Sequence, residues 1–203
     1  MIRAAMRELE ALLRWPAAMR HARDAAEVKV VLGAADTKMP GWITTGIWTL
    51  DVTRAGHFER LLGQRKADAF LAEHVWEHLD ATATLCANAN CFRFLRPGGH
   101  LRIAVPDGLH PDSAYIEHVR PGGTGAGAHD HKWLYNHAQL SASLEQAGFN
   151  VKLLEWWDEQ GEFHCVDWDS HDGHVERSKR FDPRNQGGAL KYTSLIVDAV
   201  KPL

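Results

Sequence analysis

The segment EHVWEHL at residues 73–79 gathers imidazole and carboxyl groups within a few positions. If residues 74–79 begin a helix, His74, Glu77 and His78 are related as i, i+3 and i+4 and share one face. Imidazole nitrogen and carboxylate oxygen at such spacing are typical ligands of a divalent metal, although the ligand types do not choose among Zn, Mn, Fe and Mg. Without a metal, His74 or His78 can act as a general base, or the side chains support the loop by hydrogen bonding.

A second candidate group consists of small residues. Gly33, Ala34 and Ala35 close the apolar run VKVVLG at 28–33. Small side chains let the backbone approach a ligand closely, but an ordinary turn between a strand and a helix has the same composition.

Strands and helices must hold these groups in place. Short apolar runs rich in β-branched residues predict strands, and apolar residues at helical spacing predict helices. The predicted strands are 28–33, 42–47, 48–52, 67–74, 100–106, 150–157 and 194–201. The predicted helices are 58–62, 81–95 and 136–147, with a leading helix at 3–14 that either docks on the sheet or acts as a lid.

Alternating strands and helices predict an α/β fold, a Rossmann-like three-layer sandwich around a mostly parallel sheet, because parallel strands need crossover connections. Ligands bind such sheets beyond the carboxyl ends of the strands. We therefore expect four groups of residues to converge there: 33–36, Asp51, 73–78 and 106–107.

Two segments lie outside this frame. Residues 121–131 form a glycine-rich stretch that we interpret as a mobile lid or an entry loop. Residues 158–190 form a polar insertion between the last two predicted strands. The insertion carries Arg177, Arg180 and Arg184, whose planar donors either clamp a substrate carboxylate or phosphate or belong to a solvated flap. We interpret residues 1–203 as a single domain with this insertion.

Composition excludes several classes of function. The 203 residues include 26 acidic and 23 basic ones, so the formal net charge of -3 gives no general attraction to nucleic acid, and we expect a small-molecule substrate. No apolar run approaches the length of a membrane span. The three cysteines include no CxxC pair, which favours buried thiols, and we expect a cytoplasmic protein. The composition does not indicate the oligomeric state.

Four blocks carry a family resemblance: LGAADTKMPGW, AEHVWEHL, FRFLRPGGHLRIAVPD and LEQAGFNV. In order and spacing, over roughly residues 28–155, they resemble small bacterial proteins described as class I methyltransferases that use S-adenosyl-L-methionine (SAM). The resemblance implies a seven-stranded sheet whose last strand is antiparallel. It does not specify the methyl acceptor.

The resemblance also implies a cofactor site. The turn at Gly33, Ala34 and Ala35 would approach the methionine part of SAM, although the family usually has a second glycine there. The acid that normally holds the ribose is replaced by Thr45 or Gly46, so Asp51 serves the ribose or the adenine, or else has a turn role. Glu73 completes the candidate cofactor set, and Asp36 is a weaker substitute.

A narrower resemblance concerns metal. The triplet His74, Glu77 and His78 resembles the metal site of small-RNA 3′-terminal 2′-O-methyltransferases, where a later histidine completes the set. In AHDHKWLYN that ligand corresponds to His129 or His131, and we select His131. His74, Glu77, His78 and His131 are therefore the predicted catalytic and metal residues.

Three functions remain. The leading hypothesis is a SAM-dependent methyltransferase that acts on an oxygen or nitrogen nucleophile of a small polar acceptor. The second is a methyltransferase-fold binding protein without catalysis, suggested by Ala35 and the missing ribose acid. The third is a metal-dependent enzyme that uses the same fold without SAM.

Overall fold

A seven-stranded sheet forms the centre of the computed structural model, which describes residues 15–34, 39–187 and 189–203. The strand order is β2-β1-β3-β4-β7-β5-β6. In chain order the strands are β1 (Lys29–Leu32), β2 (Ile43–Thr44), β3 (Ala67–Glu73), β4 (Leu95–Pro106), β5 (Asn150–Trp157), β6 (Phe163–Cys165) and β7 (Ser194–Val200).

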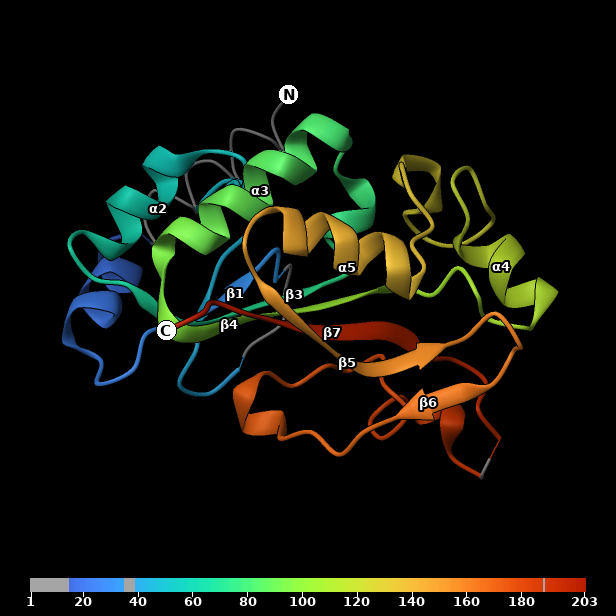
Figure 1. Cartoon of the computed structure of the whole chain (residues 1–203). Coiled ribbons are helices and arrows are strands. Elements are labelled where there is room, and N and C mark those ends of the chain that lie inside the picture. The colour runs from blue at the N-terminus through green and yellow to red at the C-terminus, as the bar shows by residue number, and fades with distance from the viewer. Residues whose placement is uncertain (1–14, 35–38, 188) are drawn as a thin grey trace.

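The sheet is mostly parallel. Strand β1 pairs in parallel with β2 and β3, and β3 pairs in parallel with β4. Strand β7 lies between β4 and β5 and is antiparallel to both, while β6 forms an antiparallel hairpin with β5. The carboxyl ends of β1, β3, β4 and β5 therefore share one edge, which is the right-hand edge in Figure 1.

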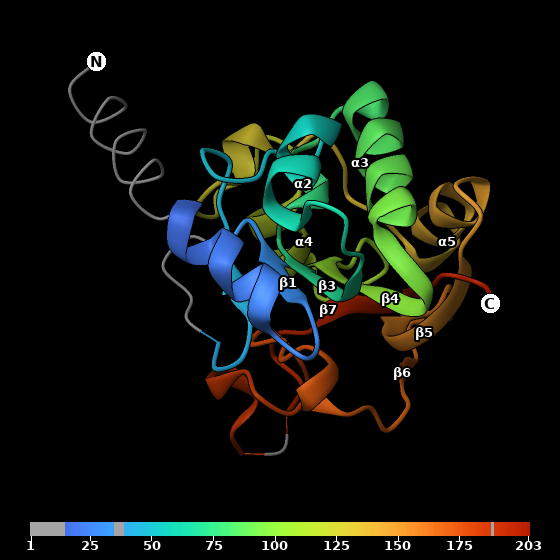
Figure 2. The same cartoon turned by 90° about the vertical axis from the view of Figure 1, so that its left-hand side faces the viewer.

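The two faces of the sheet are covered differently. Helices α2 (Ala55–Leu62), α3 (Ala81–Phe94) and α5 (His137–Gln146) lie on one face, whereas the long connection from β5 to β7 covers the other (Figures 1 and 2). The short helix α4 (Ser113–Val119) lies beyond the carboxyl ends of the strands. Single helical turns are η1 (Trp76–His78), η2 (Ala128–Asp130), η3 (Ser170–Asp172) and η4 (Pro183–Asn185). Residues 15–24 are also helical.

Burial explains why the central strands form. Strand β3 is buried from Ala69 to Ala72, and β4 is buried from Leu101 onward, as expected for strands covered on both faces. Asp80 caps α3 by accepting a hydrogen bond from the Ala83 amide, and Asn136 forms a capping box with Gln139 at α5. These caps start both helices just beyond the carboxyl edge.

The predicted fold class is confirmed, and most predicted elements are present. Two predictions are wrong. Residues 48–52 form turns instead of a strand, since the amides of Thr49 and Leu50 both bond to the Gly46 carbonyl. Residues 74–79 contain the turn η1 instead of the start of an α-helix. The predicted helix at 3–14 lies outside the described residues.

Within the described ranges, no helix is long and apolar enough to cross a membrane.

Candidate active site

The end of β3 positions the EHVWEHL residues. The His74 amide still bonds to the Ala104 carbonyl of β4, but His74 then adopts a φ of 56°, which ends the strand. A left-handed conformation is uncommon for a residue with a side chain and recurs at functional sites. The chain turns through η1, whose geometry differs from the α-helix that the spacing predicts. Glu77 and His78 therefore face a common group of residues, and His74 contacts Glu77 without joining that group.

Glu77 is the most unusual residue at this edge. Its side chain is fully buried, and neither carboxylate oxygen has a hydrogen-bond partner among the described residues. His74 Nδ1 lies 3.0 Å from Glu77 Oε1, but the contact lacks the direction of a hydrogen bond. A buried carboxyl group without partners is costly. A cation at this position would satisfy it.

Histidine ligands for such a cation are present. One ligand atom from each of Glu77, His78 and His131 lies within 4.8 Å of the others. The Nδ1 atom of His131 donates to the Val119 carbonyl at 2.7 Å, and that of His78 lies 3.5 Å from Asp130 Oδ2. Metal-binding histidines commonly use their second nitrogen this way. His74 is not in this group, so the predicted set of four is only partly brought together.

The glycine-rich loop supplies His131. Its amides bond back to α4: Thr124 donates to the Glu117 carbonyl and Gly125 to the His118 carbonyl. A Cβ atom at Gly123 or Gly125 would come within 2.5 Å of those same carbonyl oxygens. The predicted entry loop is therefore a tightly bonded turn that presents His131, and its glycines permit that close packing.

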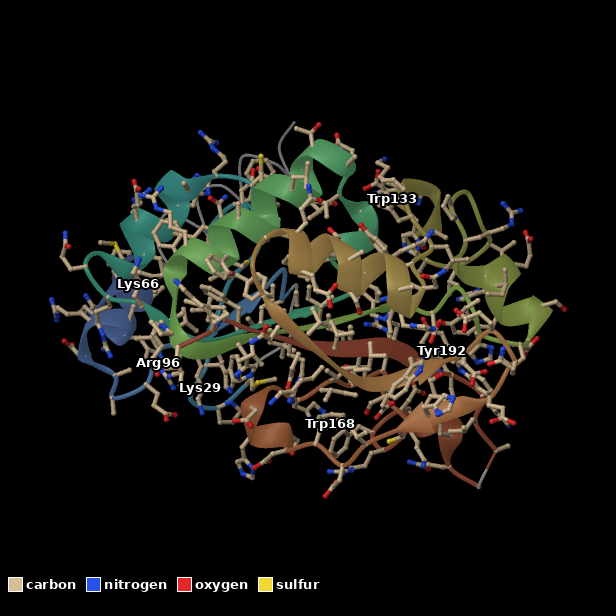
Figure 3. The ribbon with its side chains drawn as sticks, viewed as in Figure 1. Lys29, Lys66, Arg96, Trp133, Trp168 and Tyr192 are labelled. Atoms are coloured by element: carbon tan, nitrogen blue, oxygen red, sulfur yellow. The ribbon has the colours of Figure 1, made fainter. Side chains whose placement is uncertain are left out.

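His74 faces the β7 side of the site. Its Nε2 atom hydrogen-bonds Ser194 Oγ at 3.2 Å, and its ring centroid lies 6.5 Å from that of Tyr192. Burial raises the pKa of Tyr192, although the positive charges of Arg177 and Arg184 lower it. Sequence reasoning missed Ser194 and Tyr192, because they follow His74 by more than a hundred residues and no local pattern marks them. Figure 3 shows Tyr192 at this edge, opposite Lys29, Lys66 and Arg96.

The candidate cofactor turn adjoins these residues. Gly33 is exposed with a φ of 67°, and a Cβ atom there would lie 2.5 Å from Val75 Cγ2. Val75 stands between His74 and η1, so the turn after β1 packs directly on the histidine segment. Ala34 is buried and donates its amide to the Thr45 carbonyl. Ala35 and Asp36 lie outside the described residues.

The other predicted cofactor residues differ in what they offer. Thr45 is buried and donates its hydroxyl to the Val31 carbonyl, so that hydroxyl is already used. Asp51 Oδ1 accepts from the amide and hydroxyl of Thr53, which is the turn role considered above, while no described residue bonds Oδ2. Glu73 accepts hydrogen bonds from the amides of Glu176 and Arg177, so it fastens the β5–β7 connection instead of facing an open site.

Each arginine of the insertion already has an acidic partner. Arg177 pairs with Glu73, Arg180 with Asp167, and Arg184 with Asp182. The predicted anion clamp is therefore neutralised within the protein.

Asp107, at the end of β4, is also buried. Its carboxylate accepts hydrogen bonds from the amides of Leu109 and Trp157, and thereby ties the end of β4 to β5. Burial raises the pKa of Asp107 to about 6, although these two hydrogen bonds lower it.

Two other features are weaker candidates for a site than the Glu77 group. Asp158, Glu162 and His164 gather at the β5–β6 hairpin, but Asp158 bonds the His164 ring at 2.6 Å and accepts from the amides of Gln160 and Glu162. A cleft of about 420 Å³ includes none of the predicted site residues; it is lined by Glu27, Lys29, Met39, Pro40, Gly41, Trp42, Ser170 and His171.

No protein-family model matches this sequence, and no curated protein matches it. Solved structures do match. An O-methyltransferase family protein from Burkholderia thailandensis aligns over 98% of this chain and 60% of its own, with 11% identity and a TM-score of 0.50. A SAM-dependent methyltransferase from Archaeoglobus fulgidus aligns over 93% of this chain and 92% of its own, with 14% identity and a TM-score of 0.49. The chain thus spans about 60% of the first neighbour's length.

The first of these similarities establishes the class I methyltransferase fold. Because the sequence identity is only 11%, it shows the fold and not the function.

Proposed function

We propose that this protein is a SAM-dependent methyltransferase that methylates an oxygen or nitrogen nucleophile of a small polar acceptor. The reaction takes place at the carboxyl edge of the sheet, where ligands bind in folds of this class. One observation carries the proposal: the buried carboxyl group of Glu77, which makes no hydrogen bond among the described residues, lies with His78 on a segment that packs against the Gly33 turn, and His131 joins them from the glycine-rich loop.

The cofactor side fits SAM at two positions. Gly33 offers exposed backbone without a side chain, and Asp51 keeps one carboxylate oxygen for a ribose hydroxyl or an adenine amino group. Thr45 does not fit, because its hydroxyl is already bonded to the Val31 carbonyl. When bound, SAM supplies a methyl group on a positively charged sulfur.

The chain's own residues then align the acceptor and remove its proton. His74 lies at the edge and can take that proton at a ring nitrogen, and His78 can do so only in a protein without the metal. Glu77, His78 and His131 would hold a divalent metal, which would lower the acceptor's pKa. Asp130 and the Val119 carbonyl support this assignment, since they leave the second nitrogen of each histidine for the metal.

Titration calorimetry with SAM and S-adenosylhomocysteine tests the cofactor. We expect saturable binding that weakens about tenfold in Asp51→Ala, the loss of one charge-assisted hydrogen bond. Asp158→Ala, at a distant hairpin, is the control and should bind normally. No binding at millimolar ligand would reject the proposal and leave a binding protein or a SAM-independent metal enzyme. Tight binding without methylation of any acceptor tested would favour the binding protein.

Elemental analysis after exposure to Mn²⁺ or Zn²⁺ tests the metal separately. We expect about one ion per chain in the wild type, and little in Glu77→Gln or His131→Ala. The control is His164→Ala, which removes a histidine that also faces carboxylates. We expect His74→Ala to retain the ion, because His74 stands outside the group. Unchanged metal content in Glu77→Gln and His131→Ala would remove both residues as ligands.

A further inference from the structure

An exposed tryptophan stands beside the Glu77 group. Trp133 is 40% exposed, which is unusual for so large an apolar side chain. It belongs to the loop that precedes α5 and lies near the start of α3 (Figure 3). Neither the cofactor turn nor the proposed metal ligands need an aromatic ring there, so its exposure calls for a separate explanation.

Trp133 is held along the η1 backbone. Its amide bonds to the Glu77 carbonyl at 3.3 Å, and its indole Nε1 donates to the Leu79 carbonyl at 2.8 Å. The side chain therefore runs past His78, whose own side chain is partly exposed at 31%. His131 lies two positions earlier in the same loop. The indole and the two histidines thus come from two adjoining backbone segments, 77–79 and 131–133.

The ring is fixed before any ligand arrives. It stacks on Tyr135, with centroids 5.9 Å apart and planes at 29°. Tyr135 is buried, and its hydroxyl lies 3.5 Å from Thr84 Oγ1 on α3. The indole N–H is already hydrogen-bonded and one face of the ring lies toward Tyr135, so the remaining ring surface has no unsatisfied hydrogen-bonding group. It suits an apolar, flat group.

We propose that Trp133 is an acceptor-binding residue and that the acceptor carries its nucleophile on a planar aromatic or heteroaromatic ring. The inference rests on the proposed function, because it concerns the acceptor of that site. The ring would stack on Trp133 and present its substituent toward His78. A stacked aromatic contact of this kind corresponds to roughly a 3- to 10-fold change in affinity.

Two probes separate stacking from polar contact. Catechol carries two neighbouring hydroxyl groups on a flat ring, and cis-cyclohexane-1,2-diol carries the same groups on a puckered ring. Both are titrated by calorimetry into Mn²⁺-loaded protein, with and without S-adenosylhomocysteine. The variants are Trp133→Leu, which keeps apolar bulk, Trp133→Phe, which keeps an aromatic ring, and Leu85→Ala, which trims another exposed apolar side chain.

We expect Trp133→Leu to weaken catechol binding roughly 3- to 10-fold, while Trp133→Phe stays within about threefold and Leu85→Ala matches the wild type. Affinity for the diol should be the same in all four proteins. Equal catechol affinity in wild type and Trp133→Leu, equal losses for both probes, or no catechol binding to the wild type would each overturn the inference. Failure of S-adenosylhomocysteine to bind would instead count against the proposed function, since its titration is independent of Trp133.

Discussion

At the scale of single residues, the two carboxyl groups of the EHVWEHL segment have opposite surroundings. Glu73 accepts hydrogen bonds from two backbone amides of the β5–β7 connection, whereas the buried Glu77 makes no hydrogen bond among the described residues and only approaches His74 Nδ1 at 3.0 Å. A satisfied carboxylate contributes to stability, and an unsatisfied one reduces it. Of the two, Glu73 therefore has the surroundings of a residue that stabilises the fold, and Glu77 does not.

Glu77→Met should therefore stabilise the metal-free protein. Methionine has similar bulk and removes the unsatisfied group, so we expect the free energy of unfolding in EDTA to rise by about 1–3 kcal/mol. Glu73→Gln, its control, should lower it by about 1 kcal/mol. Urea denaturation measures both. If Glu77→Met unfolds more easily than the wild type in EDTA, Glu77 has a stabilising partner in solution.

Asp107 should make stability depend on pH. Its pKa is raised to about 6 in the folded protein, above the value of about 4 expected when unfolded. Below pH 4 both states are protonated; as pH rises toward 6 the unfolded state loses its proton first, so folding becomes less favourable. We expect the wild type to lose about 2–3 kcal/mol relative to Asp107→Asn between pH 4 and pH 7. A parallel pH profile for the two proteins, from urea unfolding, would contradict this.

At the scale of elements, the turn after β1 is set by its contact with Val75. Gly33→Ala adds both strain at a positive φ and a Cβ atom 2.5 Å from Val75 Cγ2. We expect a loss of about 2–4 kcal/mol, of which the strain accounts for about 1 kcal/mol. Gly41→Ala is the matched control: its φ is 78°, and a Cβ atom there meets nothing within 4 Å.

The double variant Gly33→Ala/Val75→Ala measures the steric clash between the new Cβ atom and Val75 separately from the backbone strain. We expect it to be more stable than the sum of the two single changes predicts, because the smaller Val75 position makes room for the new methyl group. Simple additivity in thermal or urea unfolding would show that the turn and the histidine segment do not pack together in solution.

Particular elements show how far the sequence alone could lead. The strands at 150–157 and 194–201 and the helix at 136–147 were predictable, since apolar spacing and the Asn136 cap are local signals. The turn that residues 74–79 actually form was not predictable, because the left-handed His74 and its bond to Ala104 depend on the neighbouring strand. The histidine spacing therefore predicted an α-helix where the chain forms the single turn η1.

The candidate site likewise contains residues that the sequence indicates and residues that it does not. Glu77 and His78 could be selected from their residue types and spacing, and His131 from the family resemblance, and the three come together. The partners Val119, Asp130 and Ser194, together with the stacking residue Trp133, carry no local sequence signal. Their positions follow from the loop after α4 and from β7, which only the folded chain defines.

At the scale of the whole molecule, the β5–β7 connection takes the place of helices on one face of the sheet. It is pinned by Arg102, which is 1% exposed and makes two hydrogen bonds to Asp198 of β7. The same guanidinium donates to the Asp169 and Gly173 carbonyls of the connection. One buried cation thus joins the sheet to its cover.

Arg102→Met should loosen the attachment of the β5–β7 connection to the sheet. We expect a loss of about 3–5 kcal/mol, because Asp198 loses its partner and two carbonyls lose their donor. Hydrogen exchange should accelerate most in residues 166–175, with a smaller effect on β3. Arg96→Met removes an arginine at the exposed start of β4 that pairs with Asp68, and it should cost less than about 1 kcal/mol. Uniform acceleration across the sheet would mean that the connection does not open by itself.

The place of β7 has a consequence for how the chain assembles. It is the last strand in the chain, yet it forms backbone hydrogen bonds with β4 on one side and with β5 on the other. Until it inserts, the β2-β1-β3-β4 unit and the β5-β6 hairpin share no backbone pairing and each exposes an open edge. During synthesis those edges are free to pair with other chains. The final strand therefore joins the two parts and covers both of these edges in a single event.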